Sequence, residues 1–499
     1  MVKFQFPPRS TRGALLGFTL GQLLMSTAGL AGALAALNLA IAGHLPEAGG
    51  ALAGGIAAIT AGLLRIRGRR ATEWLPIVIG ALRQRATRQD RYRGAIFSAH
   101  PGEHLDMPGP LAGYVWLPAT TLNGTTELGL LHHRAEHTVT AVLTYTGHSL
   151  VLADTGDQQR RLTDWAGLLN TLGGEYAEHG LTHWAMWSRT VPDAGSRAQR
   201  HLIERATDTT SRAYRSLAAL TAAGARTAQR AEHYLVVVFD VRRLSREIAS
   251  AGGGDAAVGV VIAEQLAGIA SAVREAGVDV VEWLTPRGYA AVLRTQWDPA
   301  SQPSVDLRAA GGGLDGVQPA AAGPTAAETV GWGTYVHDSG RSRTLWVHEM
   351  PRTPVGMTWL SPLLTPSGHR RTISLTAQPV PAALAALQSR RERVAKAGDE
   401  LTKRKMRLLR TAREVAEGHS VEQIDREQAA GHTRYRYALL ITVTALTDDA
   451  LDRAVLAEQR RLVRAGCAGV VLNGEPDQAF FAGGLPLARG LARMRGPLT

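Results

Sequence analysis

The chain has 499 residues, more than one hydrophobic core usually serves, so we expect at least two folded units. Its formal net charge is +12, and Arg supplies nearly all of it because Lys occurs only at Lys3, Lys396, Lys403 and Lys405. Cys467 is the only cysteine, which excludes an intrachain disulfide and a zinc cluster built on several cysteines.

The first sixty-odd residues predict a hairpin of two membrane-spanning helices, residues 1–70. No charged side chain occurs from Gly13 to Gly43, a run longer than the roughly 20 residues that cross a bilayer. A polar break at 44–47 leads to a second uncharged run, 48–64. A cleaved signal peptide is the alternative for the first run, but that run is about twice as long as the apolar core of a signal peptide.

The charges beside the two runs predict the orientation of the hairpin. Lys3 and Arg9 precede the first run, whereas the turn between the runs carries Glu47 and no Lys or Arg. By the positive-inside rule both termini face the cytoplasm, and we expect a multi-pass protein of the bacterial inner membrane. The residues expected at the membrane interface are Arg12, Arg65, Arg67, Arg69, Arg70 and Trp74.

Small residues in the two runs would let the helices approach closely in lipid. The candidates are Ala31, Gly32 and Ala35 in the first run and Gly54, Gly55 and Ala58 in the second. A general Ala and Gly bias of the composition is the alternative explanation of the same pattern.

Residues 71–110 predict a basic amphipathic segment next to the membrane. Apolar Trp74, Leu75, Ile77, Ile79 and Leu82 are followed by a cluster of arginines, as in a helix that lies on the inner leaflet. An ordinary core helix of the following body is the alternative interpretation.

The rest of the chain predicts a mixed α/β (α+β) cytoplasmic body of two related halves. Stretches of alternating and of helical periodicity follow one another in residues 111–308 and again in 331–499, and the Gly/Ala/Pro-rich segment 309–330 between them is expected to be a linker. HYLVVVFDV and AEQLAGIASAVREAGVDVV parallel RYALLITVTA and AEQRRLVRAGCAGVV, with Glu264 and Glu458 in matching places. Coincidence in an Ala-rich chain is the alternative.

No residue pattern predicts a catalytic, cofactor or metal site. A P-loop needs Gly-Lys, and this dipeptide is absent from the chain. The Gly-rich stretch 252–255 lacks the strand-to-helix placement of a dinucleotide loop. His132, His133 and His137 have no carboxylate at a zinc-protease spacing, so we expect solvated histidines of a hairpin, and Cys467 predicts a small buried thiol.

A long charged helix, 382–417, is the strongest charged feature of the body. Its Arg, Lys, Glu and Asp alternate, which is typical of a solvated or partner-contacting helix. Arg404, Lys405 and Arg407 are the candidates for contact with a partner or with nucleic acid, although no aromatic residue interleaves them as a stacking platform.

Two regions resemble subunits of conjugative type IV secretion systems. The hairpin followed by Glu73-Trp74-Leu75-Pro76 resembles the small PrgI-like inner-membrane subunit. Residues 120 to 490 look like the non-catalytic N-terminal region of TraC/TraE-type conjugation ATPases. The segments that carry this second resemblance are the hairpin around Arg341, Met350-Pro351, the run Trp359 to Leu364, the charged helix, the strand through Leu440 and Val443, the run Asp477 to Phe480, and Leu485-Pro486.

The whole chain is similar to actinobacterial conjugal-transfer proteins that combine these two parts. The resemblance implies a non-enzymatic scaffold in an oligomeric apparatus, which contacts the lipid bilayer, other secretion or conjugation subunits and a separate P-loop ATPase, with DNA as a further candidate partner. EccE, a membrane component of type VII secretion, is a competing resemblance because it also begins with two spans. A membrane-tethered nucleic-acid-binding protein is the third reading.

Overall fold

The computed structural model describes most of the chain, in two compact units. The described residues are 3–4, 20–63, 65–66, 69–94, 105–147, 153–193, 196–225, 228–310, 316–351, 353–390, 394, 426–427 and 430–491. We call residues 1–5, 89–382 and 431–499 the body, and residues 6–88 and 383–430 the hairpin unit.

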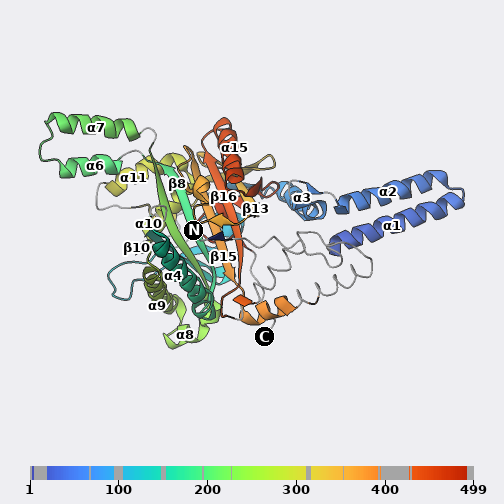
Figure 1. Cartoon of the computed structure of the whole chain (residues 1–499), viewed down its shortest axis with the longest axis horizontal. Coiled ribbons are helices and arrows are strands. Elements are labelled where there is room, and N and C mark those ends of the chain that lie inside the picture. The colour runs from blue at the N-terminus through green and yellow to red at the C-terminus, as the bar shows by residue number, and fades with distance from the viewer. Residues whose placement is uncertain are drawn as a thin grey trace. The chain divides into compact units, whose positions relative to one another are not determined.

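One large antiparallel sheet forms the centre of the body (Figure 1). From edge to edge its strands are β4 (Arg91–Arg93), β11 (Ala326–Val330), β12 (Thr334–His337), β13 (Gly340–Glu349), β16 (Tyr435–Ala445), β15 (Arg370–Pro379), β8 (Leu181–Pro192), β9 (Gln229–Asp240), β7 (Thr138–Thr146), β6 (Leu130–His133) and β5 (Tyr114–Leu117). In addition, β10 (Asp279–Trp283) pairs with β7, and β17 (Ala468–Val471) pairs with β13. The predicted mixed α/β body is therefore confirmed.

The same connectivity occurs on both sides of the central β8–β15 pair. On one side the spatial order is β8-β9-β7-β6, and on the other it is β15-β16-β13-β12. In each case a hairpin comes first in the chain, a central strand follows, and the next strand inserts between them. A helix and a short strand then complete the unit, and the short strand pairs with the second strand of the hairpin.

The sequence echo pairs Glu264 and Glu458 at matching places in their helices, but the two side chains differ in burial. Glu264 is exposed on α9 (Gly254–Glu275), whereas Glu458 on α15 (Asp448–Arg464) is fully buried. Each glutamate lies ten residues after the first residue of its helix, and the helices differ in length at their C-terminal ends, with 22 and 17 residues.

Helices cover both faces of the sheet. One face carries α10 (Pro286–Trp297), α11 (Gln302–Ala310) and α16 (Pro476–Gly483). The other carries α4 (Thr155–Gly173), α5 (Glu175–Glu178), α8 (Ser245–Ser250) and α9 beside the first set of strands, and α12 (Ser361–Leu364) and α15 beside the second. Because side chains alternate along a strand, Val236 and Val238 of β9 enter the first core while Leu235 and Val237 enter the second.

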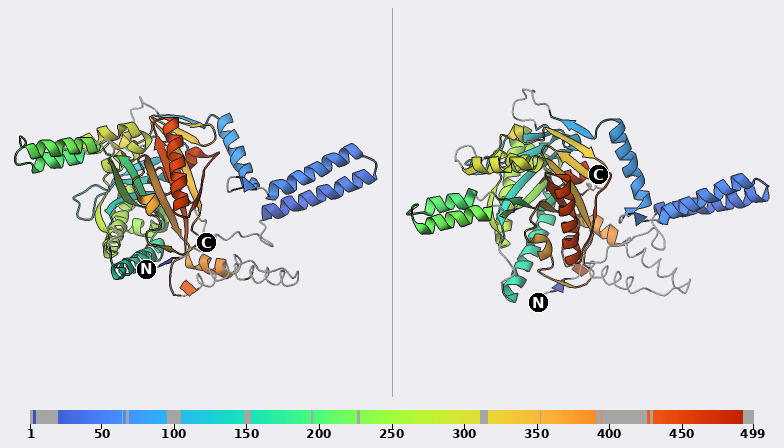
Figure 2. Two further views of the ribbon diagram at one scale, coloured as in Figure 1. Left: turned by 45° about the horizontal axis from the view of Figure 1, so that its top comes forward. Right: turned by 90° about the horizontal axis from the view of Figure 1, so that it is seen from above.

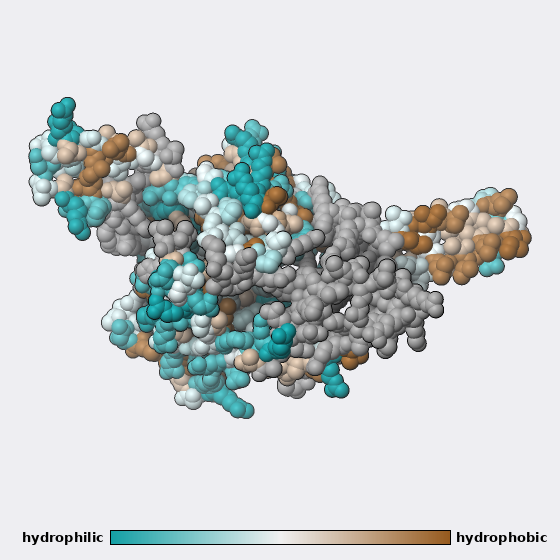
Figure 3. Space-filling model, viewed as in Figure 1, coloured by the Kyte–Doolittle hydropathy of each residue, from teal (hydrophilic) through white to brown (hydrophobic). Residues whose placement is uncertain are grey.

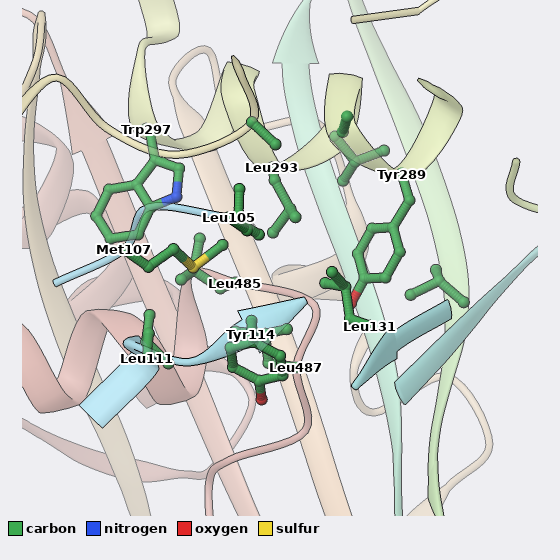
Figure 4. Close-up of a cluster of buried hydrophobic side chains, with 14 of the residues drawn as sticks. Leu105, Met107, Leu111, Tyr114, Leu131, Tyr289, Leu293, Trp297, Leu485 and Leu487 are labelled. Carbon is green, nitrogen blue, oxygen red and sulfur yellow. The ribbon is translucent and has the colours of Figure 1, made fainter. Parts of the chain in front are cut away.

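The core under α10 joins the two sets of strands (Figure 4). Trp297, at the end of α10, is fully buried, and its ring lies 5.1 Å from Phe480 of α16 and 6.3 Å from Tyr335 of β12. Leu485, which follows α16, packs in the same cluster, and the Tyr289 hydroxyl of α10 donates to the carbonyl of Pro486 at 2.7 Å. On this face the two sets of strands therefore share one apolar core.

Two helices between β8 and β9 form an arm that extends from the sheet (Figures 1 and 2). They are α6 (Ser196–Arg205) and α7 (Arg212–Ala225). Asp208 organises the connection, since its side chain accepts from the Thr210 amide at 2.8 Å. Ile203, Leu217 and Leu220 are exposed on the arm.

The predicted linker 309–330 is not a linker throughout. Its last residues form β11, which pairs with both β4 and β12. The Asp338 carboxylate accepts from the amides of Thr325 and Ala326 at 2.9 Å each, and Ala327 is buried. The Gly- and Ala-rich segment thus leads into the second strand from one edge of the sheet; residues 311–315 lie outside the described part.

The remaining elements are short. They are β1 (Lys3–Phe4), which pairs with β14 (Val355–Gly356), and the 3-10 helices η1 (Gly109–Leu111), η2 (Arg134–Glu136), η3 (Val241–Leu244), η4 (Pro299–Ser301) and η5 (Pro319–Ala321).

The described part of the hairpin unit contains α1 (Leu20–Ile41), α2 (Leu45–Leu63), α3 (Ala71–Ala86) and a helical stretch at 383–390. Two short strands, β2 (Arg65–Ile66) and β3 (Arg69–Arg70), connect α2 to α3. The break predicted at 44–47 is displaced, because α2 already begins at Leu45 and the turn lies at 42–44 with Gly43 at φ +82°. Pro46 and Glu47 belong to the first turn of α2, where proline and a negative charge favour a helix.

Candidate functional site

The two apolar helices of the hairpin unit approach each other closely along a seam of small residues. A Cβ atom on Gly55 of α2 would lie 2.8 Å from the carbonyl oxygen of Gly29 on α1. A Cβ on Gly32 would lie 3.1 Å from the Cα of Gly55. The backbones are therefore in contact at these glycines, as in close helix pairs in lipid.

The seam includes part of the predicted small-residue set. Gly55 is buried and Gly32 and Ala58 are half-buried, whereas Ala31, Ala35 and Gly54 are exposed. Three further seam residues were not predicted, namely Gly29, Ala36 and Ala48, which are all buried. Their spacing carried a signal, because Gly29, Gly32 and Ala36 are three and four residues apart and share one helix face.

Large apolar side chains cover the outside of this helix pair. Those of α1 are Leu30, Leu34, Leu37 and Ile41, with exposed fractions between 56% and 77%, and those of α2 include Leu45, Leu52 and Ile56. The space-filling view shows the corresponding hydrophobic surface along α1 and α2 (Figure 3). Pairing of the two helices alone therefore leaves this apolar surface exposed.

By length, the helices fit a bilayer. At 1.5 Å per residue, α1 and α2 are about 33 and 28 Å long, and the hydrocarbon core is about 30 Å thick. Among the helices whose side chains the structure describes, only α9 has both the length and the apolarity of a span, and 56% of its most apolar 18-residue stretch is buried inside the body. The described side chains of α1 cover the shorter stretch Met25–Ile41, so the two-span hairpin remains a prediction.

Three of the predicted interface arginines, Arg65, Arg69 and Arg70, lie in the short strands that follow α2. Arg65 pairs with Arg70 in the ladder of β2 and β3, so the chain reverses between α2 and α3. Trp74 is half-buried in the first turns of α3. Arg69 belongs to β3, while Arg12 and Arg67 lie outside the described residues, as do Arg404, Lys405, Arg407 and most of the charged helix 382–417.

Helix α3 has an exposed apolar face. Leu75, Ile79 and Leu82 are 57% to 58% exposed, and at about 100° per residue they lie within about 60° of one another around the helix. Ile77 and Ala81 are buried on a different side of the helix. Of the two interpretations of this segment, an amphipathic helix agrees with this exposure.

The histidines of the β6–β7 hairpin are less exposed than predicted. His132 and His133 are only 7% and 4% exposed, and only His137 is solvated. The His133 Nδ1 atom accepts from the Glu136 amide at 3.1 Å and its Nε2 atom lies 3.1 Å from the Pro110 carbonyl, so its role is to cap a turn. Burial lowers the pKa of His132.

The other candidate reactive groups are also structural in their surroundings. Cys467 is buried, and burial raises the pKa of its thiol to about 11, which disfavours the nucleophilic thiolate. Gly252 and Gly253 connect α8 to α9, Gly254 is the first residue of α9, and all three have positive φ. No group of three or more metal-ligating side chains occurs among the described residues.

Several largely buried charges of the body form a network of ion pairs. Glu232 of β9 binds Arg189 and Arg230 at 2.6 Å each, and Arg230 also binds Asp306 of α11 at 2.7 Å. Burial alone would raise the pKa of Glu232, but the two guanidinium groups and the Tyr234 hydroxyl outweigh it and lower the pKa. A carboxylate held in this way is a structural anion rather than a proton donor.

A scan of known protein-family models and a search of curated proteins both found no match to this chain.

Proposed function

We propose that this protein is a non-enzymatic scaffold of a conjugal DNA-transfer or type IV-like secretion apparatus, anchored in the bacterial inner membrane with both termini in the cytoplasm. It docks a separate P-loop ATPase at that membrane. The observation that carries the proposal is the α1–α2 pair, whose seam is made of small residues and whose outer surface is made of exposed leucines and isoleucines. Such a surface suits lipid and is costly in water.

The body supports a role in assembly rather than in chemistry. The largely buried Glu232, Arg189, Arg230 and Asp306 pair with one another, and its only thiol has a raised pKa. The sequence contains no Gly-Lys dipeptide for a P-loop. The resemblance of the chain to conjugal-transfer subunits motivates the choice of apparatus.

We also propose that the two sets of strands descend from one duplicated unit. The repeated order of hairpin, central strand, inserted strand, helix and returning strand supports this reading. The shared core under α10 then corresponds to the interface between the two copies.

Purification of the tagged full chain in detergent from its native membrane tests the function. We expect conjugation or secretion subunits, including a P-loop ATPase, to co-purify, and the isolated chain to hydrolyse no ATP. A chain that extracts into buffer without detergent would contradict the anchor. A monomer without such neighbours, or one that itself turns over nucleotide, would contradict the scaffold.

A further inference from the structure

Helix α3 follows the proposed membrane hairpin after a very short connection. Arg65 and Arg70 are antiparallel partners, which places their Cα atoms about 5 Å apart, and α3 begins at the next residue, Ala71. The chain therefore returns to the end of α2 before α3 starts. If α2 spans the bilayer, the first turn of α3 lies at the depth of the lipid headgroups.

The side chains of α3 suit this position. Leu75, Ile79 and Leu82 form an exposed apolar face, and Arg83 and Arg85 occupy the last turns of the helix. An apolar face of this kind buries to the boundary between headgroups and acyl chains when a helix lies in the plane of the membrane.

The local charge selects the kind of membrane. Residues 65–88 carry seven arginines and one acidic residue, Glu73. Each arginine near an anionic bilayer surface contributes on the order of 1 kcal/mol of attraction. A surface of zwitterionic lipids would offer no comparable attraction.

We propose that α3 is an in-plane helix that binds the anionic lipid surface of the cytoplasmic leaflet through Leu75, Ile79 and Leu82. The α1–α2 pair holds the chain in the bilayer, and the binding of α3 to the surface depends on the fraction of anionic lipid. This inference rests on the proposed membrane anchor.

The test uses the full chain with Cys467→Ala and one new cysteine that carries an environment-sensitive fluorophore. Ile79→Cys reports the apolar face of α3. Gly80→Cys is the matched control, because it is exposed about 100° away on the same helix and has open space at its Cβ position. Leu37→Cys on the outer surface of α1 reports the anchor itself.

Each labelled chain is reconstituted into vesicles of phosphatidylcholine with or without phosphatidylglycerol. Quenching by nitroxide-labelled lipid is compared with quenching by aqueous iodide. In anionic vesicles we expect lipid quenching at Ile79 to exceed that at Gly80 by roughly twofold or more. Changing Arg83 and Arg85 to Gln is expected to weaken the bound state of α3 roughly fivefold per charge.

Three results would overturn the inference in distinguishable ways. Equal iodide access at Ile79 and Gly80, with Leu37 still quenched by lipid, would remove α3 from the membrane and leave the anchor intact. Iodide access at Leu37 would remove the anchor. Protection of Ile79 by double-stranded DNA but not by anionic vesicles would make α3 a nucleic-acid surface instead.

Discussion

Arg370 and Arg371, two consecutive residues of β15, are buried on opposite faces of the same sheet. Arg370 donates to the Thr295 carbonyl at 2.5 Å and to the side chain of Gln296 at 2.9 Å. Arg371 forms an ion pair with Glu458 of α15 at 2.7 Å. Burial lowers the pKa of both guanidinium groups, to about 9 for Arg370, which therefore stays charged at neutral pH.

Arg371→Met is expected to destabilise the body strongly. The substitution leaves Glu458 fully buried with the weaker partners His369 and Arg461, and breaking a buried pair costs about 3 kcal/mol or more. The double change of Arg371 and Glu458 to Met should recover most of this loss, because no buried charge then remains unpaired. Denaturant unfolding of the detergent-solubilised chain measures the free energy of unfolding.

Arg242→Met is the control for this pair. Arg242 binds Asp240 at 2.7 Å, but its side chain is 62% exposed, so the expected change is within about 1 kcal/mol. If the double variant is as unstable as Arg371→Met alone, packing rather than charge pairing explains the loss.

The strands of the body could be predicted because the alternation of apolar and polar residues is visible within each short segment. The partners of Arg371 could not be predicted. Glu458 lies 87 residues away in the chain, and nothing in the sequence near either residue marks the contact. The matching Ala-Glu-Gln segments suggested instead that Glu458 resembles Glu264, which is exposed. Buried pairing depends on which strands neighbour each other, and that is a property of the whole sheet.

The hairpin unit shows the same limit on a smaller scale. The length and apolarity of its helices follow from the sequence, as does the involvement of Gly32 and Gly55 in the seam. Which glycines face the partner depends on the exact rotation of each helix, and this separates Gly55 from its exposed neighbour Gly54. The turn position also shifts, because Pro46 is compatible with the start of a helix as well as with a break.

Gly55→Leu is expected to separate α1 from α2. A side chain there would collide with the Gly29 backbone, which cannot move aside as a flexible side chain can. Ala36 and Ala48 are both buried near the turn, and cysteines placed there in a Cys467→Ala chain report the pairing by oxidative cross-linking. We expect the cross-linked fraction to fall at least roughly tenfold, as a clash worth more than about 1.4 kcal/mol would produce.

Gly54→Leu provides the control for the hairpin. Its Cβ position has open space within 4 Å, so cross-linking should match that of the unsubstituted chain. Equal cross-linking in both variants would mean that α1 and α2 do not pack through Gly55.

Trp297→Ala is expected to weaken both sets of strands at once. The indole is fully buried and contacts Tyr335, Phe480 and Phe481, so its removal leaves a large cavity that costs about 3 to 5 kcal/mol. Because this core joins both sides of the sheet, the body should still unfold in a single transition at a lower temperature. Calorimetry of the solubilised chain measures this.

Trp332→Ala serves for comparison. The Trp332 side chain is 45% exposed, so its removal should lower the free energy of unfolding much less. Two separated transitions in Trp297→Ala would show that the two sets of strands fold independently.

His337 is expected to make the stability of the body depend on pH. Its ring is fully buried, its Nδ1 atom donates to the Trp297 carbonyl at 2.6 Å, and its Nε2 atom accepts from the Ser342 hydroxyl at 2.8 Å. Both bonds are made by the neutral ring. Burial, partly opposed by the bond to Trp297, lowers the pKa of His337 from 6.5 to about 4.

The direction of the effect follows from this lowered pKa. Between pH 6.5 and 4 the unfolded chain binds a proton at His337 that the folded chain does not, so stability is complete above pH 6.5 and is lost as the pH falls toward 4. The full loss is about 3 kcal/mol. His132 and His233 also have lowered pKa values and act in the same direction. The contribution of His337 is therefore measured by comparing a His337 variant with the unsubstituted chain, not from the pH dependence of the unsubstituted chain alone.

His337→Asn keeps a donor near the Trp297 carbonyl but removes the titrating ring. We expect the free energy of unfolding of this variant to be lower at pH 7. Between pH 6 and pH 4.5 it should also depend less steeply on pH, because unfolding of the variant takes up about one proton fewer. His137→Asn is the matched control, because His137 is exposed and has a left-handed backbone that Asn tolerates. An unchanged slope in His337→Asn would show that His337 is not the neutral, buried base that its two hydrogen bonds indicate.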